Sequence, residues 1–270
     1  MPELPEVETT RRGILPYCEH QTIVQCTVRN PRLRWPVAAD FSEQVVGQTI
    51  RTVTRRAKYL IFDLGRLSVL WHLGMSGSLR IATVQQPIRK HDHIDWVLSN
   101  DSILRFHDPR RFGSVLMTDD PDRHTLLYKL GPEPLSDSFT ADYLYQQSRG
   151  KTVAVKNFIM NSGVVVGVGN IYASEALFMA GIHPLKAAGK VSLLAYRRLT
   201  DAIKTVLAAS IEQGGTTLRD FVHGNGEPGY FKQQLRVYER AGQPCRQCEK
   251  PLTRRVIGQR SSYYCTQCQR

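Results

Sequence analysis

The sequence predicts an α+β protein in which an antiparallel β-sandwich or barrel is followed by helices and then by a small β-hairpin held by cysteines. Three observations lead to this order. Between residues 21 and 118, short runs rich in β-branched and aromatic residues follow one another with turns but no helices between them. From residue 140 onward, apolar residues recur at helical spacing. Four of the six cysteines lie within the last 26 residues.

The length allows two domains, or one large domain with an appendage, and the charge indicates a polyanionic partner. A chain of 270 residues with 41% hydrophobic residues supports real cores, and its formal net charge of +12 favours nucleic acid over an anionic membrane. The N-terminus is acidic and lacks an apolar run, so we expect no signal peptide. The most apolar stretch, residues 164–182, is interrupted by polar residues and predicts no membrane span. We therefore expect a cytoplasmic protein with reduced thiols.

The first dozen residues support two interpretations. Removal of Met1, expected before a small residue, leaves Pro2 as a terminal secondary amine. Such an amine titrates near pH 7.7–8 and can attack a carbonyl-like carbon, with the Glu3 carboxylate at hand for proton transfer. The plainer interpretation is a well-polarised helix over residues 3–16, with arginines in its last turn and Pro16 as its end. These residues alone favour the plainer one.

Eight runs predict the strands, and four later segments predict helices. The strand runs cover residues 22–30, 49–57, 58–64, 67–73, 76–82, 93–99, 102–107 and 112–118. A Pro- and Gly-rich linker at 131–137 marks the domain boundary. Helices are expected over residues 140–149, 152–161, 170–182 and 192–214, the last with an apolar face of Leu194, Leu199, Ile203, Val206 and Leu207. The polar, glycine-rich segment 216–231 is predicted to be a mobile loop.

The cysteine pattern is the most specific feature of the chain. Cys245 and Cys248 form one CxxC pair and Cys265 and Cys268 another, with a predicted hairpin between them. This spacing predicts one structural Zn²⁺ bound by four thiolates, and a reducing compartment disfavours the alternative of disulfides. Basic residues outnumber the single Glu249 in this segment, which suits contact with DNA phosphates: Arg246, Lys250, Arg254, Arg255, Arg260 and Arg270.

Three motifs in the sandwich region each have a functional and a structural interpretation. Lys58 in RRAKYL either delivers an amine into a site or is an edge lysine that keeps its charge in water. Met75, between two glycines, is either an exposed flexible tip or a core methionine beside a turn. Arg110 and Phe112 in DPRRFG suit insertion into a base stack, although a solvated charge beside a buried Phe is the commoner arrangement.

Two further features suggest contacts with phosphate. Lys90, His91 and His93 add possible phosphate ligands, and they lack a third metal ligand at suitable spacing, so no second metal is predicted. Asn170 follows two glycines as the expected N-cap of a helix, which is an anion-binding arrangement.

Together, these stretches resemble the bacterial formamidopyrimidine-DNA glycosylases over essentially the whole chain. The matching motifs are MPELPEVETTRRG, RRAKYL, HLGMSGSLR, KHDH, DPRRFG, LGPEPLSD, VVGVGNIYASEALFMAGIHP, IEQGGTTLRDF, PGYF and the cysteine ribbon. The resemblance implies a catalytic β-sandwich domain flanked by helices (residues 1–131), a linker with a first helix (132–150), a helix-two-turn-helix domain with a lesion-covering loop (151–231, the loop at 216–225) and a zinc ribbon (235–270).

The resemblance also implies a monomeric base-excision repair enzyme acting on double-stranded DNA that contains oxidised purines or abasic sites. Its implied activities are removal of 8-oxoguanine and formamidopyrimidines, then β,δ-elimination at the abasic site. The implied catalytic residues are Pro2, Glu3, Lys58 and Arg260, with Glu6 and Glu175 in support. The implied DNA contacts are His91, Arg110, Lys151, Met75, Phe112, His72, Lys156, Asn170 and Tyr238.

Two rival functions remain at this point. The first is an endonuclease VIII-like enzyme for oxidised pyrimidines, although that group begins PEGPE where this chain has PELPE. The second is a zinc-ribbon DNA-binding protein without catalysis, against which the presence of Pro2, Glu3 and Lys58 speaks.

Overall fold

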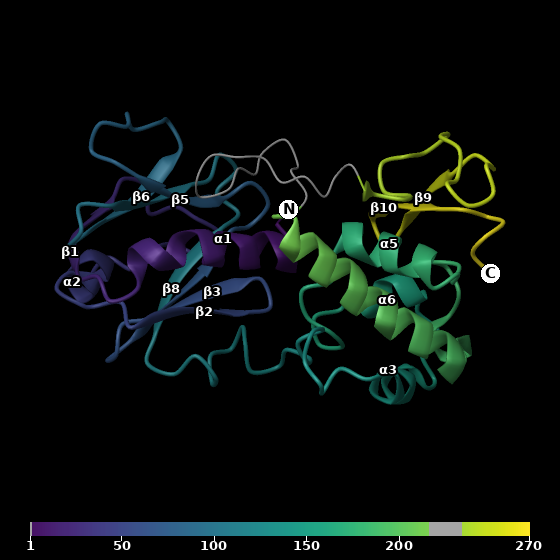
Figure 1. Cartoon of the computed structure of the whole chain (residues 1–270). Helices are drawn as coiled ribbons and strands as arrows, with labels where there is room; N and C mark the ends of the chain where they lie inside the picture. The colour runs from purple at the N-terminus through teal and green to yellow at the C-terminus, as the bar shows by residue number, and fades with distance from the viewer. Residues whose placement is uncertain (1, 216–233) are drawn as a thin grey trace. The chain divides into compact units, whose positions relative to one another are not determined.

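The computed structural model describes residues 2–215 and 234–270 (Figure 1). The predicted loop at 216–225 lies outside the described residues. The strands are β1 (Ile23–Val28), β2 (Thr52–Arg56), β3 (Tyr59–Asp63), β4 (Ser68–His72), β5 (Ser78–Ala82), β6 (Asp92–Leu98), β7 (Ile103–His107), β8 (Ser114–Thr118), β9 (Thr253–Ile257) and β10 (Arg260–Tyr264). The helices are α1 (Leu4–Cys18), α2 (Phe41–Val45), α3 (Ala141–Ser148), α4 (Val155–Ile159), α5 (Asn170–Met179), α6 (Leu193–Glu212) and the 3-10 turn η1 (Ala188–Lys190).

The chain divides into two compact units. The first contains the residues up to Tyr128 together with the short stretch after α6 that begins at Gln213. The second runs from Lys129 to Glu212 and also contains the C-terminal cysteine segment. The ribbon therefore shares a unit with the helices.

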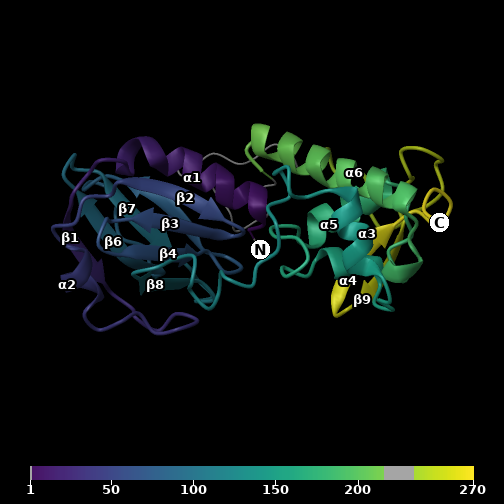
Figure 2. The same cartoon turned by 90° about the horizontal axis from the view of Figure 1, so that it is seen from below.

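The first unit is a sandwich of two antiparallel four-stranded sheets, which confirms the predicted class. One sheet has the order β1-β6-β7-β5. The other has the order β2-β3-β4-β8, which Figure 2 shows. All eight predicted strand runs contain a strand. Helix α1 contacts β2 at the edge of one sheet and β5 at the edge of the other, so it covers one open side. Turns join the strands from β2 to β8, but the five-residue helix α2 lies between β1 and β2, so the expectation of no helix in this region is wrong there.

An aromatic cluster fills the space between the two sheets. Trp71 and Trp96 are fully buried, and their rings meet edge to face with centroids 5.1 Å apart. Phe62 and Phe106 complete the cluster at 5.3 Å from Trp96 and 5.5 Å from Trp71. Burial of each such ring stabilises the fold by about 1.5–3 kcal/mol.

Helix α1 is longer than the sequence predicts. It continues through Pro16 to Cys18, so the expectation that Pro16 ends it is wrong. Proline in the last turn removes one helix hydrogen bond, but the extra turn buries the Cys18 side chain, and the Glu19 N–H still closes the helix on the Leu15 carbonyl at 3.0 Å. Arg11 and Arg12 consequently lie in the middle of the helix, where both contact Glu8.

The second unit packs the helices α3 to α6 together with the ribbon. Helix α6 packs on α3 and α5, and the β9–β10 hairpin packs on α5. Of the predicted apolar face of α6, Leu199, Ile203, Val206 and Leu207 are buried. Leu194 is the exception, because it lies in the first turn and is 64% exposed. Phe178 of α5 joins Cys245, Cys265 and their neighbours in a small apolar cluster beneath the ribbon.

Candidate functional site

The start of the chain is buried beside two carboxylates. Pro2, Glu3 and Glu6 are all buried. Glu3 and Glu6 form a reciprocal capping box, in which the Glu3 N–H donates to Glu6 Oε2 at 2.9 Å. A Cβ added to Gly215 would lie 3.1 Å from Glu6 Oε1, so the chain beyond α6 passes directly over this carboxylate. The N-terminal proline is thus held in an acidic and enclosed environment.

Helix α1 directs this end toward the turn that carries Lys58. Arg11 Nη1 donates to the Val53 carbonyl at 3.3 Å, and Arg55 Nε donates to Glu8 Oε2 at 3.1 Å. Helix α1 and strand β2 therefore run antiparallel, so the N-terminal end of α1 lies toward the C-terminal end of β2 and the turn that follows it. Lys58 lies in the two-residue turn between β2 and β3, beside Ala57 with φ +55°, and not at the head of a strand.

His72 is held neutral at the end of β4. Burial, followed by the positive charges of Lys58 and Arg34, lowers the pKa of His72 to about 4. Its Nδ1 accepts the Gly74 N–H at 3.0 Å, so its proton is on Nε2. The neutral ring is therefore a hydrogen-bond donor at Nε2 over the whole physiological range.

The Met75 turn and the Arg110–Phe112 turn are joined through Asp108. Its buried carboxylate accepts Ser76 Oγ–H at 2.9 Å and the Gly113 N–H at 2.8 Å. Gly74, with φ +67°, lies so close to Phe112 and Gly113 that a Cβ would collide with their backbone. The sequence indicated two separate turns and did not indicate that they are one rigid element, because the joining contacts are long-range.

The side chains on these turns are presented outward. Phe112 is 44% exposed, and Arg110 Cζ lies 4.8 Å from the centroid of its ring. Met75 is half-buried. The alternatives of a buried Phe and a core methionine do not apply to these residues.

The two histidines of the KHDH motif differ. His93 is buried and its Nε2 bonds to the Asp108 carbonyl at 2.8 Å, so the expected phosphate contact at His93 is wrong. His91 is half-buried, with its ring centroid 5.9 Å from that of His107. Strict alternation would place the two histidines on one face, but His91 precedes β6 and a register shift between Asp92 and Ile94 redirects the chain there.

In the second unit, a buried lysine connects α4, α5 and the ribbon hairpin. Lys156 is fully buried and donates to Asn170 Oδ1 and, at 2.6 Å, to Ser262 Oγ. Asn170 Nδ2 donates to the Ser261 carbonyl at 2.9 Å. The N-cap of α5 is Gly169, so the expectation that Asn170 caps the helix is wrong. No local pattern points to the serine partners, which lie about 100 residues away from Lys156.

Glu175 fixes the backbone that leads into the ribbon. Its carboxylate accepts the N–H groups of Arg236, Val237 and Tyr238 at 2.8–2.9 Å. Burial raises the pKa of the Glu175 carboxyl, although these three donors oppose the rise. The Tyr238 ring consequently stands 5.1 Å from that of Tyr263 on the hairpin.

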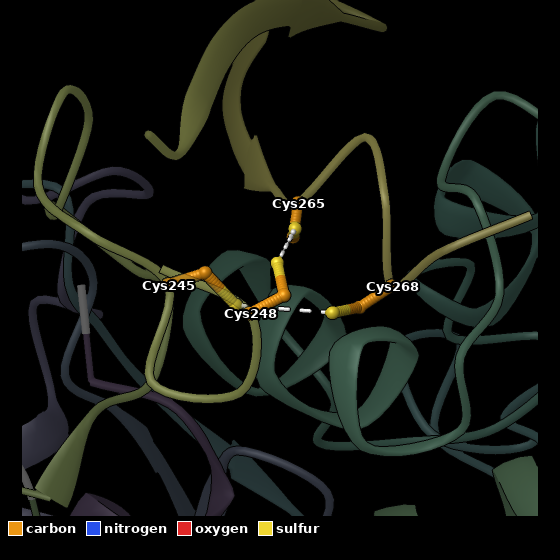
Figure 3. Close-up of side chains that lie close together, drawn as sticks. All are labelled: Cys245, Cys248, Cys265 and Cys268. Atoms are coloured by element: carbon orange, nitrogen blue, oxygen red, sulfur yellow. Dashed lines mark hydrogen bonds between the residues drawn. The ribbon is translucent and has the colours of Figure 1, made fainter. Parts of the chain in front are cut away.

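The four ribbon cysteines lie close enough together to hold a metal ion (Figure 3). All four sulfur atoms lie within 4.8 Å of one another, with Cys248 and Cys265 at 3.4 Å and Cys245 and Cys268 at 3.9 Å. A zinc tetrahedron with Zn–S bonds of about 2.3 Å has edges of about 3.8 Å, so the donors fit Zn²⁺. Burial would raise the pKa of Cys265, but nearby backbone N–H groups and thiols lower it to about 7, which favours the thiolate.

The remaining predicted contacts are exposed. Arg260 begins β10 directly after the hairpin turn, and Lys151 follows α3, where its carbonyl accepts the Gly189 N–H at 2.9 Å.

Among the described residues, no helix has both the length and the hydropathy that a membrane span requires.

The fold and the cysteine cluster together define a protein that joins a β-sandwich to a helical unit with a zinc finger. Three family models match in order: the formamidopyrimidine-DNA glycosylase N-terminal domain at residues 1–115, its H2TH (helix-two-turn-helix) domain at 130–222, and the zinc finger found in FPG and IleRS at 242–270. The chain therefore belongs to the formamidopyrimidine-DNA glycosylase family.

Individual relatives agree over the full length. Formamidopyrimidine-DNA glycosylases of Methylococcus capsulatus and Teredinibacter turnerae are 59% and 58% identical, each with 100% of both chains covered. The crystal structure of the MutM (FPG) protein of Thermus thermophilus matches with a TM-score of 0.89 at 38% identity, over 99% of this chain and 98% of that one. A complex of the Lactococcus lactis Fpg with DNA containing an abasic site matches with a TM-score of 0.91 at 31% identity, over 99% of both chains.

Proposed function

We propose that this protein is a monomeric, bifunctional base-excision repair enzyme of the bacterial cytosol. It removes oxidised purines such as 8-oxoguanine and formamidopyrimidines from double-stranded DNA, and then cleaves the abasic site by β,δ-elimination. Family membership supports a glycosylase that acts on damaged DNA. The observation that carries the fuller proposal is the burial of Pro2 beside the interlocked carboxyl groups of Glu3 and Glu6.

The chemistry begins at the terminal nitrogen. Once Met1 has been removed, Pro2 is a secondary amine that is partly unprotonated near neutral pH. Its nitrogen attacks C1′ of the damaged nucleotide, a C1′–N bond forms, and the glycosidic bond breaks as the base leaves with a proton. The sugar ring then opens to give an iminium, with Glu3 supplying the proton to the ring oxygen. The iminium acidifies the proton at C2′, so elimination of the 3′ phosphate follows.

Cationic and neutral donors hold the two phosphates that flank the lesion. Lys58, in the turn toward which α1 points, is a phosphate contact and a proton donor in β-elimination. His72 donates from Nε2 as a neutral ring, since its pKa of about 4 keeps it uncharged. Arg260 on the ribbon hairpin is the proton donor in δ-elimination and binds the second phosphate.

The joined turns replace the base that leaves the stack. A damaged base must be extruded before its glycosidic bond can be reached. Phe112 and Met75 enter the vacated space, and Arg110, stacked on Phe112, faces the orphaned base. Asp108 holds both turns before DNA arrives, so little ordering cost is added at insertion.

The second unit contributes contacts with the backbone of the DNA. His91 of the first unit and Lys151, Asn170 and Tyr238 of the second would bind phosphates, and Lys156 positions Asn170. One structural Zn²⁺, bound by the four cysteines, would hold the hairpin that presents Arg260. A site closed by four thiolates has no open position for substrate, so zinc takes no part in the chemistry of the lesion.

Borohydride trapping tests the proposal directly. Reduction during reaction with an 8-oxoguanine duplex should link the protein to DNA, and peptide mass spectrometry should place the adduct on Pro2. Pro2→Gly should still bind the duplex but lose most of the lyase activity, whereas Pro5→Ala, in the first turn of α1, should retain it. An adduct on Lys58 would show that the roles are assigned wrongly.

The same assay separates the rival functions. Faster turnover of thymine glycol than of 8-oxoguanine would indicate an endonuclease VIII-like enzyme. Absence of any trapped adduct, with duplex binding intact, would indicate a DNA-binding protein without catalysis.

A further inference from the structure

Residues 32–36 form a tight exposed hairpin in the first unit. A β-bridge pairs Arg32 with Pro36, and Leu33, only 8% exposed, fixes the hairpin to the sandwich core. Its tip consists of Arg34 and Trp35, which are both exposed. An exposed cation beside an exposed tryptophan contributes nothing to the core, so their placement needs another explanation.

The tip is bonded to the turn that carries Phe112. The Arg34 N–H donates to the Gly113 carbonyl at 3.0 Å, and Gly113 in turn donates its N–H to Asp108 at 2.8 Å. Arg34 therefore sits one hydrogen bond away from the residue that follows Phe112. The tip is therefore a direct backbone neighbour of the turn that carries Phe112.

The tip also belongs to the positive cluster around His72. Arg34 acts on His72 and on Tyr59 strongly enough to lower the pKa that burial alone would give each. Its guanidinium lies 5.0 Å from the centroid of the Trp35 ring. Within the described part of the chain, no carboxylate pairs with that guanidinium. Like charges gathered in this way favour an anion that is not part of the protein.

We propose that the Arg32–Pro36 hairpin is a further DNA-contact element, in which Arg34 binds a backbone phosphate beside the step where Phe112 inserts, and Trp35 orients the Arg34 guanidinium. This inference rests on the proposed function, because it requires a duplex at the Phe112 turn. The stacked ring restricts the guanidinium, so less side-chain entropy is lost when the phosphate is bound. The DNA then covers the exposed edge of Trp35.

Tryptophan fluorescence offers a direct test. The chain has three tryptophans, and Trp71 and Trp96 are fully buried, whereas Trp35 is 36% exposed. Acrylamide should therefore quench mainly Trp35 in the protein alone. Saturation with a duplex carrying a tetrahydrofuran abasic analogue, which cannot be cleaved, should abolish most of that quenching. Trp35→Phe should lack the quenchable component with or without DNA, and a Trp35 that stays equally quenchable in the complex would overturn the proposal.

The salt dependence of binding tests Arg34 separately. One phosphate contact contributes about 0.9 to the slope of log K against log salt, so it changes the binding constant about eightfold between 1 M and 0.1 M salt. Arg34→Gln should lower the slope for the same duplex by about one and weaken binding about eightfold at 0.1 M salt. The control Arg123→Gln removes an equal charge at a side chain that is 91% exposed, and should change neither. Equal slopes for wild type and Arg34→Gln would contradict the contact.

Different results would overturn the proposed function and the Arg34 contact. Wild-type protein that does not bind the duplex at all would overturn the proposed function together with this contact. Wild-type protein that binds and is trapped through Pro2, but whose affinity is indifferent to Arg34→Gln, would overturn this contact alone.

Discussion

Replacement of His72 by asparagine should remove a destabilisation that the wild-type protein acquires in acid. His72 is half-buried at the end of β4, with Lys58 and Arg34 as the charged groups that act on it and the Tyr59 ring 4.8 Å away. Protonation would place a third positive charge among them. Asparagine keeps an acceptor near the position of Nδ1 for the Gly74 N–H but cannot take up a proton.

The size of the effect follows from the pKa. The folded state holds His72 at a pKa of about 4, against 6.5 in the unfolded chain. Between these values the unfolded state binds more protons, so stability is lost as the pH falls from 6.5 and levels off below about 4. At about 1.36 kcal/mol per pH unit, the loss is about 2 kcal/mol at pH 5 and at most about 3 kcal/mol overall.

The assay compares urea unfolding of the two proteins, followed by near-ultraviolet circular dichroism of the sandwich tryptophans. At pH 7.5 the free energies of unfolding of the wild type and His72→Asn should differ only by the contacts that the substitution removes. At pH 5 that difference should shift by about 2 kcal/mol in favour of the variant. A nuclear magnetic resonance titration should place the His72 midpoint near 4. A midpoint near 6.5, or a difference in stability that does not change with pH, would refute the electrostatic account.

Two further predictions concern the joined turns and the metal site. Gly74→Ala should destabilise the first unit by about 1–3 kcal/mol more than Gly47→Ala in thermal unfolding. Both glycines have positive φ, but the space around Gly47 is open, whereas a Cβ at Gly74 would meet the Phe112 backbone. Equal losses of stability would show that the two turns can separate freely. Cys248→Ser should release zinc, measured by elemental analysis, and weaken DNA binding, whereas Cys26→Ser, outside the cluster, should do neither; unchanged affinity in a zinc-free variant would contradict this role for the ribbon.

Local patterns were sufficient for the strands and the cysteine cluster. Each strand run depends on alternation and on its own turns, and each CxxC pair depends on two positions in one loop. Neither requires knowledge of a distant residue. The end of α1 was missed for the opposite reason, since the chain continues through Pro16 to bury Cys18 against a core that only the folded state contains.

The connections within the site could not be found in this way. Lys156 has the charge of a DNA contact, yet it is fully buried and bonded to Asn170 and Ser262. His93 resembles its neighbour His91 in every local respect, but only the fold shows that its ring bonds to the Asp108 backbone. Sequence identifies which residue types are available, whereas the long-range hydrogen bonds decide which of them support the others.

Asp108 shows why such support matters for a site that we propose enters a base stack. Its carboxylate bonds to the Met75 turn and to the Phe112 turn, and its N–H donates to the His91 carbonyl at 3.0 Å. One fully buried residue thus connects the three loops that carry the proposed contacts of the first unit. A loop ordered only on binding would cost about 1–2 kcal/mol per residue at the moment of insertion. Because folding has already ordered these turns, the binding energy of the phosphates would remain available for the proposed unstacking of the damaged base.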